Sequence, residues 1–447
     1  GSAEDVKIDS IKIKLSQVGI YYNLVLKLNT DPVSDNVFLS ASDESVDVNL
    51  YNFVVPASSS EIIDVYSDMV PDKTGAVTLT VGYISAVGSS SLNPLESPSD
   101  VLCQTVTVIN ENDTQGGVSK QEYNALVALY NATGGDNWTN HIGWLDPNVP
   151  VSGWYGVTVE NGKVTRLYLY NNELSGALPA EIGDLSNLES LDVLNNKILS
   201  FPAEVGNLTN LKTLFVDGNE LQELPSEIGK LSNLESLFVG NNNILSLPIE
   251  IKNLNNLKTL DYSGNNLTNF PMEAIDIPNL EKLDVMFNKI TSIPAEIAKL
   301  KGLKSLTVRY NKIESLPPEI SELKNLTILD LMGNNLEKVP IEVLSMVNLE
   351  ELDLGSNGIS SVPVEIMGLA NLKKLYFYGN NLQEFPTEIL GLTNLESLNV
   401  AYNYNISSVP ETINLLSNLK YLDVRGNSIT VLPDSVLNLK KLNSLRV

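Results

Sequence analysis

The stretch Leu211-Lys-Thr-Leu214-Phe-Val216-Asp-Gly-Asn219-Glu-Leu221, followed by Leu224-Pro225, recurs almost every 23 residues along the chain. The opening residues of the other copies are Val164, Leu188, Leu234, Leu257, Leu280, Leu303, Leu326, Leu349, Leu372, Leu395, Leu419 and Leu442. A fixed period of this length predicts a solenoid of stacked repeats. We therefore expect the chain to present one long curved surface instead of a pocket.

The first half of each repeat predicts a short strand, since Leu211, Leu214 and Val216 are spaced so that alternate residues share a face. One repeat alone cannot bury these side chains, so the repeats must stack. The ninth position is an asparagine, and we predict a buried ladder of amides that satisfies backbone groups. These asparagines are Asn172, Asn196, Asn219, Asn242, Asn265, Asn288, Asn311, Asn334, Asn357, Asn380, Asn403 and Asn427.

The second half of each repeat reads Leu-Pro-x-x-Ile-x-x-Leu, as from Leu224 to Leu231. Proline suits the first turn of a helix, because its missing N–H would have no partner there. The apolar residues three apart predict a short helix or 3₁₀ turn whose apolar side faces inward. We therefore expect strands on a concave side and helical turns on a convex side.

The pattern L-x-x-L-x-L-x-x-N-x-L resembles the leucine-rich repeat family over roughly two thirds of the chain. Its 23-residue Leu-Pro form is similar to bacterial and Ras-associated repeats, and the first repeat, from Asn172 to Pro179, resembles the plant-type variant. The resemblance implies an α/β horseshoe of about 12–13 repeats over residues 164–447.

The part before the repeats predicts two further regions. Residues 1–112 hold alternating segments such as Ile11–Leu15 and Leu24–Leu28, which favour an all-β, immunoglobulin- or fibronectin-like sandwich. Residues 113–163 read as a linker and a cap with a helix over Lys120–Tyr130 and all three tryptophans of the chain. The order of these elements resembles plant-type caps, but without their paired cysteines this cap must be held by packing.

Composition and motifs argue against most chemistry. The net charge of −25 argues against nucleic acid and anionic membranes as partners. Cys103 is the only cysteine and His141 the only histidine, which leaves neither a catalytic triad nor a metal site. No apolar run is long enough to span a membrane. We predict a protein that is not an enzyme and holds no cofactor.

A column of aspartates recurs at the fifth position of the repeats: Asp192, Asp261, Asp284, Asp330, Asp353 and Asp423. Neighbouring strands lie only about 4.8 Å apart, so these carboxylates follow one another in a straight row. Calcium needs six or more oxygens that converge on one point, which a straight row does not supply. We interpret the row as a solvated polar column.

The side chains at positions three, five, seven and eight should project from the concave sheet, and some of them are of the kinds that form interaction hot spots. They fall into three clusters. The first contains Tyr168, Tyr170, Leu194, Phe215 and Phe238, the second contains Met286, Phe287, Arg309, Tyr310 and Met332, and the third contains Tyr376, Tyr378 and Tyr402 with Arg425. An additional residue near Tyr404 predicts a β-bulge that turns this tyrosine outward. The predicted binding residues are Tyr168, Tyr170, Phe215, Phe238, Met286, Phe287, Arg309, Tyr310, Met332, Tyr376, Tyr378, Tyr402, Tyr404 and Arg425.

These features predict a monomeric, secreted or cell-surface binding protein whose concave face recognises a protein ligand, for which a host protein is one source. The whole arrangement resembles surface repeat proteins of gut Bacteroidetes, including lipoproteins and adhesins. Gly1-Ser2 resembles a cloning remnant, so we expect a signal or lipid anchor to have been removed. One alternative is a glycan-binding module that uses Tyr376, Tyr378 and Tyr402; a second is an intracellular scaffold.

Overall fold

The computed structural model describes the backbone of strands between Val6 and Val108, and all residues from Thr114 to Val447, with side chains from Gly116 onward. The chain divides into two compact units, Gly1–Gln121 and Glu122–Val447. Cys103 and much of the predicted linker lie outside the described residues.

The first unit contains antiparallel strands. Strand β1 (Val6–Lys14) pairs with β5 (Ser45–Val55) and β7 (Val77–Gly88), and β7 pairs with β8 (Val106–Val108). A second group joins β2 (Tyr22–Leu28) to β3 (Asp31–Pro32), β4 (Val37–Leu39) and β6 (Ile63–Met69). The segments between these strands and the side chains lie outside the described residues, so the immunoglobulin-like sandwich stays a prediction.

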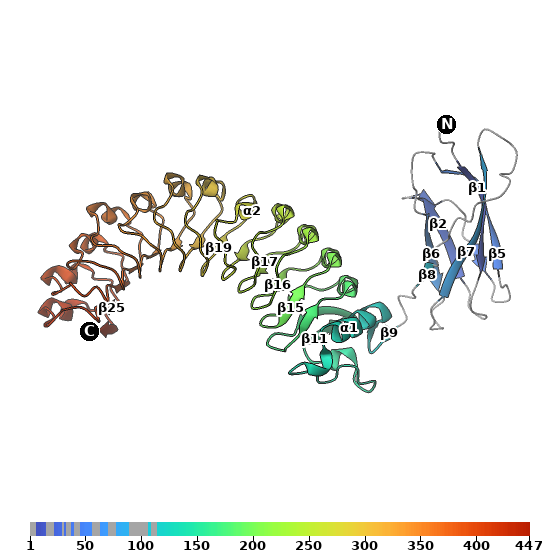
Figure 1. The fold of residues 1–447 in the computed structure, drawn as a ribbon, viewed down its shortest axis with the longest axis horizontal. Helices are drawn as coiled ribbons and strands as arrows, with labels where there is room; N and C mark the ends of the chain where they lie inside the picture. The colour runs from blue at the N-terminus through green and yellow to red at the C-terminus, as the bar shows by residue number, and fades with distance from the viewer. Residues whose placement is uncertain are drawn as a thin grey trace. The chain divides into compact units, whose positions relative to one another are not determined.

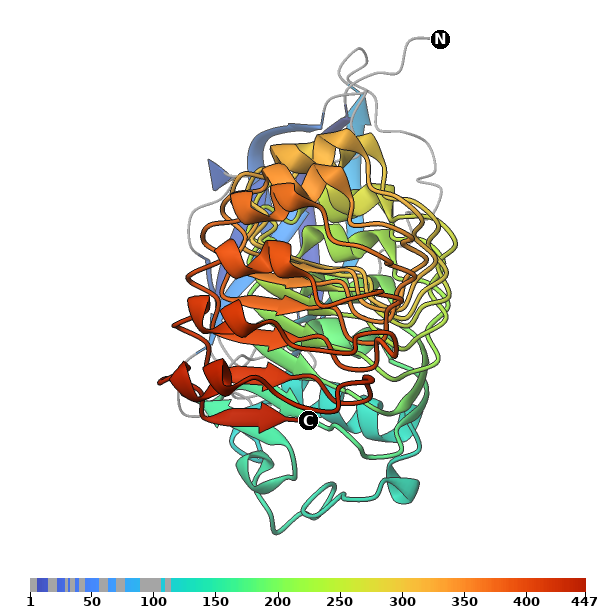
Figure 2. The ribbon, with the colours of Figure 1, turned by 90° about the vertical axis from the view of Figure 1, so that its left-hand side faces the viewer.

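The second unit is built on a 14-stranded sheet that lines the inner side of a curved stack (Figure 1). One antiparallel pair begins the sheet, and every later pair is parallel in an unbroken register that aligns Leu214 with Leu237 and Leu260. Seen along the stack, strands of successive repeats lie side by side (Figure 2). The strands are β11 (Val157–Glu160), β12 (Lys163–Tyr168), β14 (Ser190–Asp192), β16 (Thr213–Phe215), β17 (Ser236–Phe238), β18 (Thr259–Asp261), β19 (Lys282–Asp284), β20 (Ser305–Thr307), β21 (Ile328–Asp330), β22 (Glu351–Asp353), β23 (Lys374–Tyr376), β24 (Ser397–Asn399), β25 (Tyr421–Asp423) and β26 (Ser444–Arg446).

The outer side of the stack carries short helical turns, as the Leu-Pro half-repeat predicts (Figure 1). The proline precedes the turn in extended conformation, and its carbonyl accepts the first hydrogen bond, as from Ile228 N to Pro225 O at 3.0 Å. One turn is α-helical, α2 (Met272–Ile275), and a flanking parallel pair joins β13 (Ser175–Ala177) to β15 (Lys197–Ser200). The 3₁₀ turns are η3 (Ala180–Asp184), η4 (Ala203–Asn207), η5 (Ser226–Lys230), η6 (Ile249–Asn253), η7 (Ala295–Lys299), η8 (Pro318–Glu322), η9 (Ile341–Ser345), η10 (Val364–Gly368), η11 (Thr387–Gly391), η12 (Glu411–Leu415) and η13 (Asp434–Asn438).

The predicted asparagine ladder is confirmed. In one repeat, Asn242 Nδ2 donates to Val216 O of the preceding repeat at 3.0 Å and to Val239 O of its own repeat at 3.2 Å. Its Oδ1 accepts the N–H of Leu221 at 3.0 Å. Each amide therefore ties the backbone of two neighbouring repeats together where the strands end.

Aromatic packing closes the N-terminal end of the stack. Helix α1 (Lys120–Ala132) follows a small hairpin of β9 (Thr114–Gln115) and β10 (Val118–Ser119), and the turns η1 (Gly135–Asn137) and η2 (Val151–Gly153) follow the helix. Trp138, Trp144 and Trp154 are all buried, and their neighbouring ring centroids lie 4.9 Å apart. The large rings cover the apolar end of the stack, so packing holds this segment, as the sequence predicts.

We predict that Asn242→Ala lowers the free energy of unfolding by roughly 1–3 kcal/mol, because it leaves buried backbone groups without partners. Urea unfolding followed by circular dichroism would measure the loss. The matched control is Asn243→Ala, since Asn243 is the exposed neighbour of Asn242. Equal unfolding midpoints for the two variants would contradict a stabilising role for the ladder.

Candidate functional site

The concave sheet brings Phe215 and Phe238 of the first predicted cluster together. The rings of Phe215 and Phe238 stack with centroids 4.6 Å apart and planes inclined by 15°, and both side chains are half-buried. Tyr168 and Tyr170 lie two repeats earlier and are exposed. The parallel register places Phe215 directly beside Phe238, which is why residues 23 apart in sequence form one aromatic surface.

The second cluster forms a denser group. Phe287 and Tyr310 stack with centroids 4.6 Å apart and planes inclined by 12°, and both rings are exposed. The Arg309 guanidinium lies 5.2 Å from the centre of the Tyr310 ring and 3.6 Å from Asp330 Oδ2. Met286, predicted for the same cluster, is half-buried.

Met332 is the member of this cluster that the structure removes from the surface. Only 7% of the residue is exposed, because the Arg309 guanidinium reaches its sulfur at 2.8 Å and the Tyr378 hydroxyl donates to the same sulfur. The expectation that Met332 is exposed on the concave face is therefore wrong. Its sulfur instead positions Arg309 and Tyr378.

The third cluster is divided. Tyr378 leans over Gly355 toward Met332 and so joins the second cluster, whereas the Tyr402 ring covers Gly426 of the following repeat. Tyr376, in the same repeat as Tyr378, is half-buried. The predicted group of Tyr376, Tyr378 and Tyr402 is thus not one surface, because the rings of Tyr378 and Tyr402 point along the stack in opposite directions.

Two further predicted residues differ in detail from expectation. Tyr404 is 70% exposed, but it lies in a turn after β24 and not in a β-bulge, and its carbonyl accepts the Ser428 hydroxyl. Arg425 is engaged within the protein, where it donates to the buried Asp423 carboxylate at 2.7 Å. Burial would raise the pKa of Asp423, but the hydrogen bonds from Arg425 and Tyr421 outweigh it and hold this pKa below its ordinary range.

The eighth position of the repeat has a backbone feature that the sequence analysis missed. Every residue there has a positive φ, between 49° and 67°. Nine of the twelve are glycine, asparagine or serine, and the other three are Phe287, Tyr310 and Tyr402. The full set is Asn171, Asn195, Gly218, Asn241, Gly264, Phe287, Tyr310, Gly333, Ser356, Gly379, Tyr402 and Gly426. A bulky aromatic residue in this left-handed region is a real conformational outlier.

The backbone is strained at the three aromatic residues, Phe287, Tyr310 and Tyr402. A left-handed conformation costs a residue with a Cβ about 1–2 kcal/mol, and asparagine tolerates it better than an aromatic residue. The neighbouring repeat makes room for two of the rings, because a Cβ on Gly333 would lie 2.5 Å from the Tyr310 ring and one on Gly426 would lie 2.3 Å from Tyr402. Strain of this kind is concentrated at functional sites in proteins.

The aspartates of the fifth position have a local structural role. Each accepts a hydrogen bond from the backbone N–H two residues later, as Asp284 does from Met286 at 2.8 Å and Asp353 from Gly355 at 2.8 Å. Except for the buried Asp423 they are half-buried, so the column is less solvated than predicted. Burial, together with neighbouring carboxylates, raises the pKa of Asp284 and of Asp353 to about 7.

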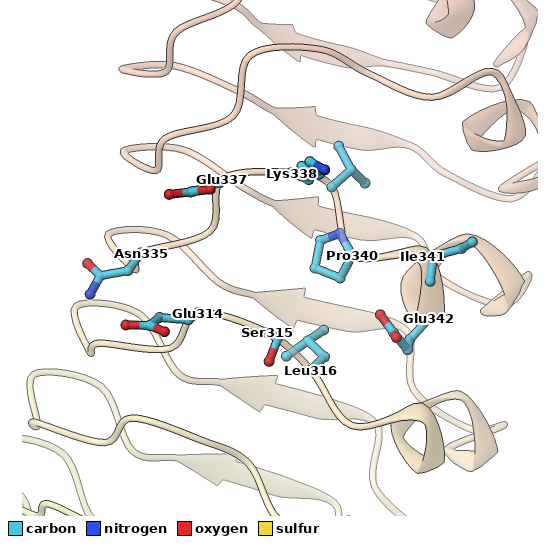
Figure 3. Close-up of a pocket in the computed structure, with 10 residues that line it drawn as sticks. Glu314, Ser315, Leu316, Asn335, Glu337, Lys338, Pro340, Ile341 and Glu342 are labelled. Atoms are coloured by element: carbon cyan, nitrogen blue, oxygen red, sulfur yellow. The ribbon is translucent and has the colours of Figure 1, made fainter.

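An open groove lies on the flank of the stack, between the asparagine turns and the 3₁₀ turns of two repeats (Figure 3). It contains none of the predicted binding residues and is lined by Glu314, Ser315, Leu316, Asn335, Glu337, Lys338, Val339, Pro340, Ile341 and Glu342. Among the described residues, no group of three histidine, cysteine, aspartate or glutamate side chains could hold a metal ion. None of the described helices is long and apolar enough to cross a membrane.

Comparison with known proteins agrees with this geometry. Family models described as leucine rich repeat match residues 278–336, 324–382, 347–404 and 418–439, and one described as leucine-rich repeat region matches residues 166–241. A leucine-rich repeat protein of Leptospira interrogans is 40% identical, with a TM-score of 0.60, over 63% of this chain and 72% of that protein. The chain belongs to the leucine-rich repeat family.

Other leucine-rich repeat structures are similar over comparable lengths. The ectodomain of the Arabidopsis thaliana membrane receptor kinase GASSHO1/SCHENGEN3 is 26% identical with a TM-score of 0.57 over 75% of this chain, which spans only 44% of that chain. An internalin of Listeria monocytogenes shares the fold at 23% identity and a TM-score of 0.52, over 64% of this chain and 89% of that chain. No curated protein matches the chain.

The left-handed eighth position of these leucine-rich repeats predicts an unusual order of stabilities. We expect Tyr402→Gly to be more stable than Tyr402→Ala by about 1 kcal/mol, because only glycine adopts a positive φ without cost. Urea unfolding of both variants tests this. At Ser305, in β20 on the same face, alanine should instead be the more stable substitution. The same order of stabilities at both positions would contradict a strained backbone at Tyr402.

Because the pKa of Asp353 is raised, we predict that Asp353→Asn increases the stability of the folded protein by an amount that depends on pH. A carboxyl whose pKa is raised by folding favours the folded state below about pH 4, and this contribution is lost as the pH rises to about 7. Asparagine stays neutral and accepts the same hydrogen bond, as Asn399 does from Ala401. We expect the free energy of unfolding of Asp353→Asn to exceed that of the unsubstituted protein by about 2 kcal/mol at pH 8, a value discounted for the partial exposure of the carboxyl. At pH 4 we expect no difference. Thermal unfolding across this range measures it, and a pH-independent difference would contradict it.

Asp423→Asn supplies the opposite control. Because the pKa of Asp423 is lowered, its contribution to stability is present at neutral pH and is lost as the pH falls through the folded-state value. The substitution should therefore destabilise the protein at pH 8, and the penalty should shrink toward acidic pH.

Proposed function

We infer that this leucine-rich repeat protein is a non-enzymatic binding protein that recognises another protein through its concave face, at the cell surface or after secretion. The observation that carries this function is the stacked pair of Phe287 and Tyr310. Both rings are exposed on the sheet although their backbone is in a conformation that favours glycine or asparagine. The fold does not require these aromatic side chains there, since Asn195 and Gly264 fill the same position in other repeats.

The group around Arg309 has the chemistry of an interaction hot spot. Arginine and aromatic residues dominate the energetics of protein interfaces, particularly where their side chains are held in place before binding. Arg309 is held by Asp330, Met332 and the Tyr310 ring. A partner would therefore meet a surface that loses little conformational entropy on association.

The relatives support the same function. The similar plant receptor ectodomain was solved in complex with CASPARIAN STRIP INTEGRITY FACTOR 2, so a repeat stack of this kind can bind a partner outside the cell. The similar internalin supports the fold alone. An anchored or secreted form is the localisation that agrees best with these relatives.

The glycan alternative receives less support from the arrangement of the tyrosines. A sugar ring stacks on a flat aromatic platform flanked by polar groups. Tyr378 and Tyr402 lean in opposite directions along the stack and Tyr376 is half-buried, so these three side chains do not form such a platform. The exposed aromatic and arginine side chains instead spread over several repeats, as a protein interface requires.

The test begins with a photo-reactive side chain at Thr307, on the concave sheet, to cross-link and identify partners from host and microbial extracts. Each purified partner is then titrated against Phe287→Asn/Tyr310→Asn, which installs the residue that Asn195 and Asn241 supply in other repeats. We expect affinity to fall by about tenfold or more, or about 1.4 kcal/mol.

The matched control removes apolar surface from the other side of the stack. Ile341 and Val364 lie on successive 3₁₀ turns and are 73% and 56% exposed. Ile341→Asn/Val364→Asn should leave the affinity unchanged. A loss in this control, or full affinity in the concave variant, would remove the concave face as the binding surface.

A further inference from the structure

Two neighbouring turns on the outer side of the stack carry exposed apolar side chains. Ile341 and Val347 belong to the repeat of η9, and Val364 and Met367 lie in η10. Each of the four residues is at least 47% exposed. We call these four residues the convex apolar face.

The 3₁₀ geometry places these side chains in rows. Three residues complete one turn of a 3₁₀ helix, so side chains three apart lie in line. The row of Val343 and Met346 in the repeat of η9 faces the core and is buried. The neighbouring rows are Ile341, Leu344 and Val347 in this repeat and Val364, Met367 and Ala370 in the repeat of η10.

Other turns of the stack have polar or small residues in the same row. These residues are Ala203, Gly206 and Thr209 at η4, Pro318, Ser321 and Lys324 at η8, and Glu411, Asn414 and Ser417 at η12. Single exposed apolar residues are normal on a protein surface, whereas a group of them marks a site of interaction. The stack itself does not require apolar residues here, so the convex apolar face indicates a contact with another molecule.

The open groove on the flank of the stack borders this face. Ile341 lies at the edge of the groove near the 3₁₀ turns (Figure 3). The buried residues Leu316, Val339 and Pro340 supply apolar parts of the groove lining. A partner that covers the convex apolar face can therefore extend into the groove.

The edges of the groove are acidic. Glu314 and Glu337 lie at the edge near the asparagine turns, and Glu342 lies at the other edge (Figure 3). Lys338 is the one basic residue among the lining residues. Within the part of the chain whose side chains are described, none of these four residues forms an ion pair. The groove therefore has an excess of negative charge beside an apolar surface.

We propose that the convex apolar face and the groove together dock a basic amphipathic segment of a partner protein. The apolar side of this segment covers Ile341, Val364 and Met367, and its lysines or arginines lie beside Glu337 and Glu342. This site goes beyond the proposed function, because the 3₁₀ turns lie on the outer side of the stack and the concave sheet on its inner side (Figure 1).

Charge complementarity favours this occupant over a second copy of the chain. Each copy has a net charge of −25, and a symmetric contact would bring two identical acidic grooves close together. Like charges that face each other across an interface disfavour association. A basic amphipathic segment instead matches both the apolar and the acidic part of the surface, and its attraction to the acidic groove increases the rate of association.

The test uses the full chain and a fluorescent peptide of leucine and lysine, spaced so that a helix has one apolar and one basic side. Its twin has glutamate in place of lysine. By fluorescence anisotropy at low salt, we expect the basic peptide to bind at least about tenfold more tightly than the twin. Ile341→Asn/Val364→Asn and Glu337→Gln/Glu342→Gln should each weaken the binding of the basic peptide by about tenfold.

Matched controls make the same changes at equivalent positions of other turns. Ile249→Asn/Met272→Asn removes exposed apolar side chains from η6 and α2, where Lys252 interrupts the apolar row. Glu181→Gln/Glu204→Gln removes exposed carboxylates from η3 and η4. Each control should change the affinity for the basic peptide by less than about twofold. Thermal unfolding of every variant checks that the fold is retained.

Several results would overturn the proposal. Full binding to Ile341→Asn/Val364→Asn, an equal loss in either control, or equal binding of the glutamate twin would each mean that the peptide does not recognise this surface. Sedimentation velocity of the chain without peptide tests for a second copy. A dimer that dissociates in Ile341→Asn/Val364→Asn would also overturn the proposal, because the convex apolar face would then contact another copy of the chain.

The same variants separate this proposal from the proposed function. The partner that is cross-linked through Thr307 contacts the concave sheet, so it should keep its affinity for Ile341→Asn/Val364→Asn, whereas the basic peptide should not. Loss of the basic peptide in Phe287→Asn/Tyr310→Asn would overturn the convex site, since the peptide would then lie on the concave face. Peptide binding that needs Ile341 and Val364, with a partner that does not need Phe287 and Tyr310, would support the convex site and overturn the proposed function.

Discussion

The asparagine amide at the ninth position of each repeat is the interaction on which the rest of the second unit depends. Asn242 reaches carbonyls two and three residues back in its own repeat and one in the repeat before, so the chain must turn sharply after each strand. The left-handed eighth residue supplies that turn. The ladder that stabilises the stack therefore also fixes where a side chain is strained and where it is exposed.

Exact stacking has a second consequence, which is electrostatic. Residues one repeat apart become strand neighbours, so a repeated charge meets its own copy in every repeat. On the flank, glutamate and lysine alternate, and ion pairs such as Lys304–Glu281 at 2.8 Å result. On the concave sheet, aspartate follows aspartate, as at Asp261 and Asp284, and burial, with a smaller effect of the neighbouring carboxylate, raises the pKa of Asp284. The concave face is therefore acidic, whereas glutamate and lysine charges on the flank compensate each other.

Sequence reasoning predicted the second unit well because its period determines its geometry. The strands, the helical turns, the buried asparagines and the tryptophan packing all follow from which residues must be buried. Sequence reasoning did not predict the direction in which long side chains point. Met332 was expected on the surface and is covered by Arg309 and Tyr378, which converge on its sulfur from different repeats. A list of concave positions contains no information on whether a tyrosine leans toward one neighbouring repeat or the other.

The feature by which we distinguish the proposed binding residues from structural ones was nevertheless present in the sequence. Glycine and asparagine fill most eighth positions, a composition typical of a positive φ, and against it Phe287, Tyr310 and Tyr402 are exceptions. A fold that needs only a turn there gains nothing from an exposed ring and loses about 1–2 kcal/mol at each one. This departure from the residues usual at the eighth position lies on the concave face, where contacts with a partner would offset the strain.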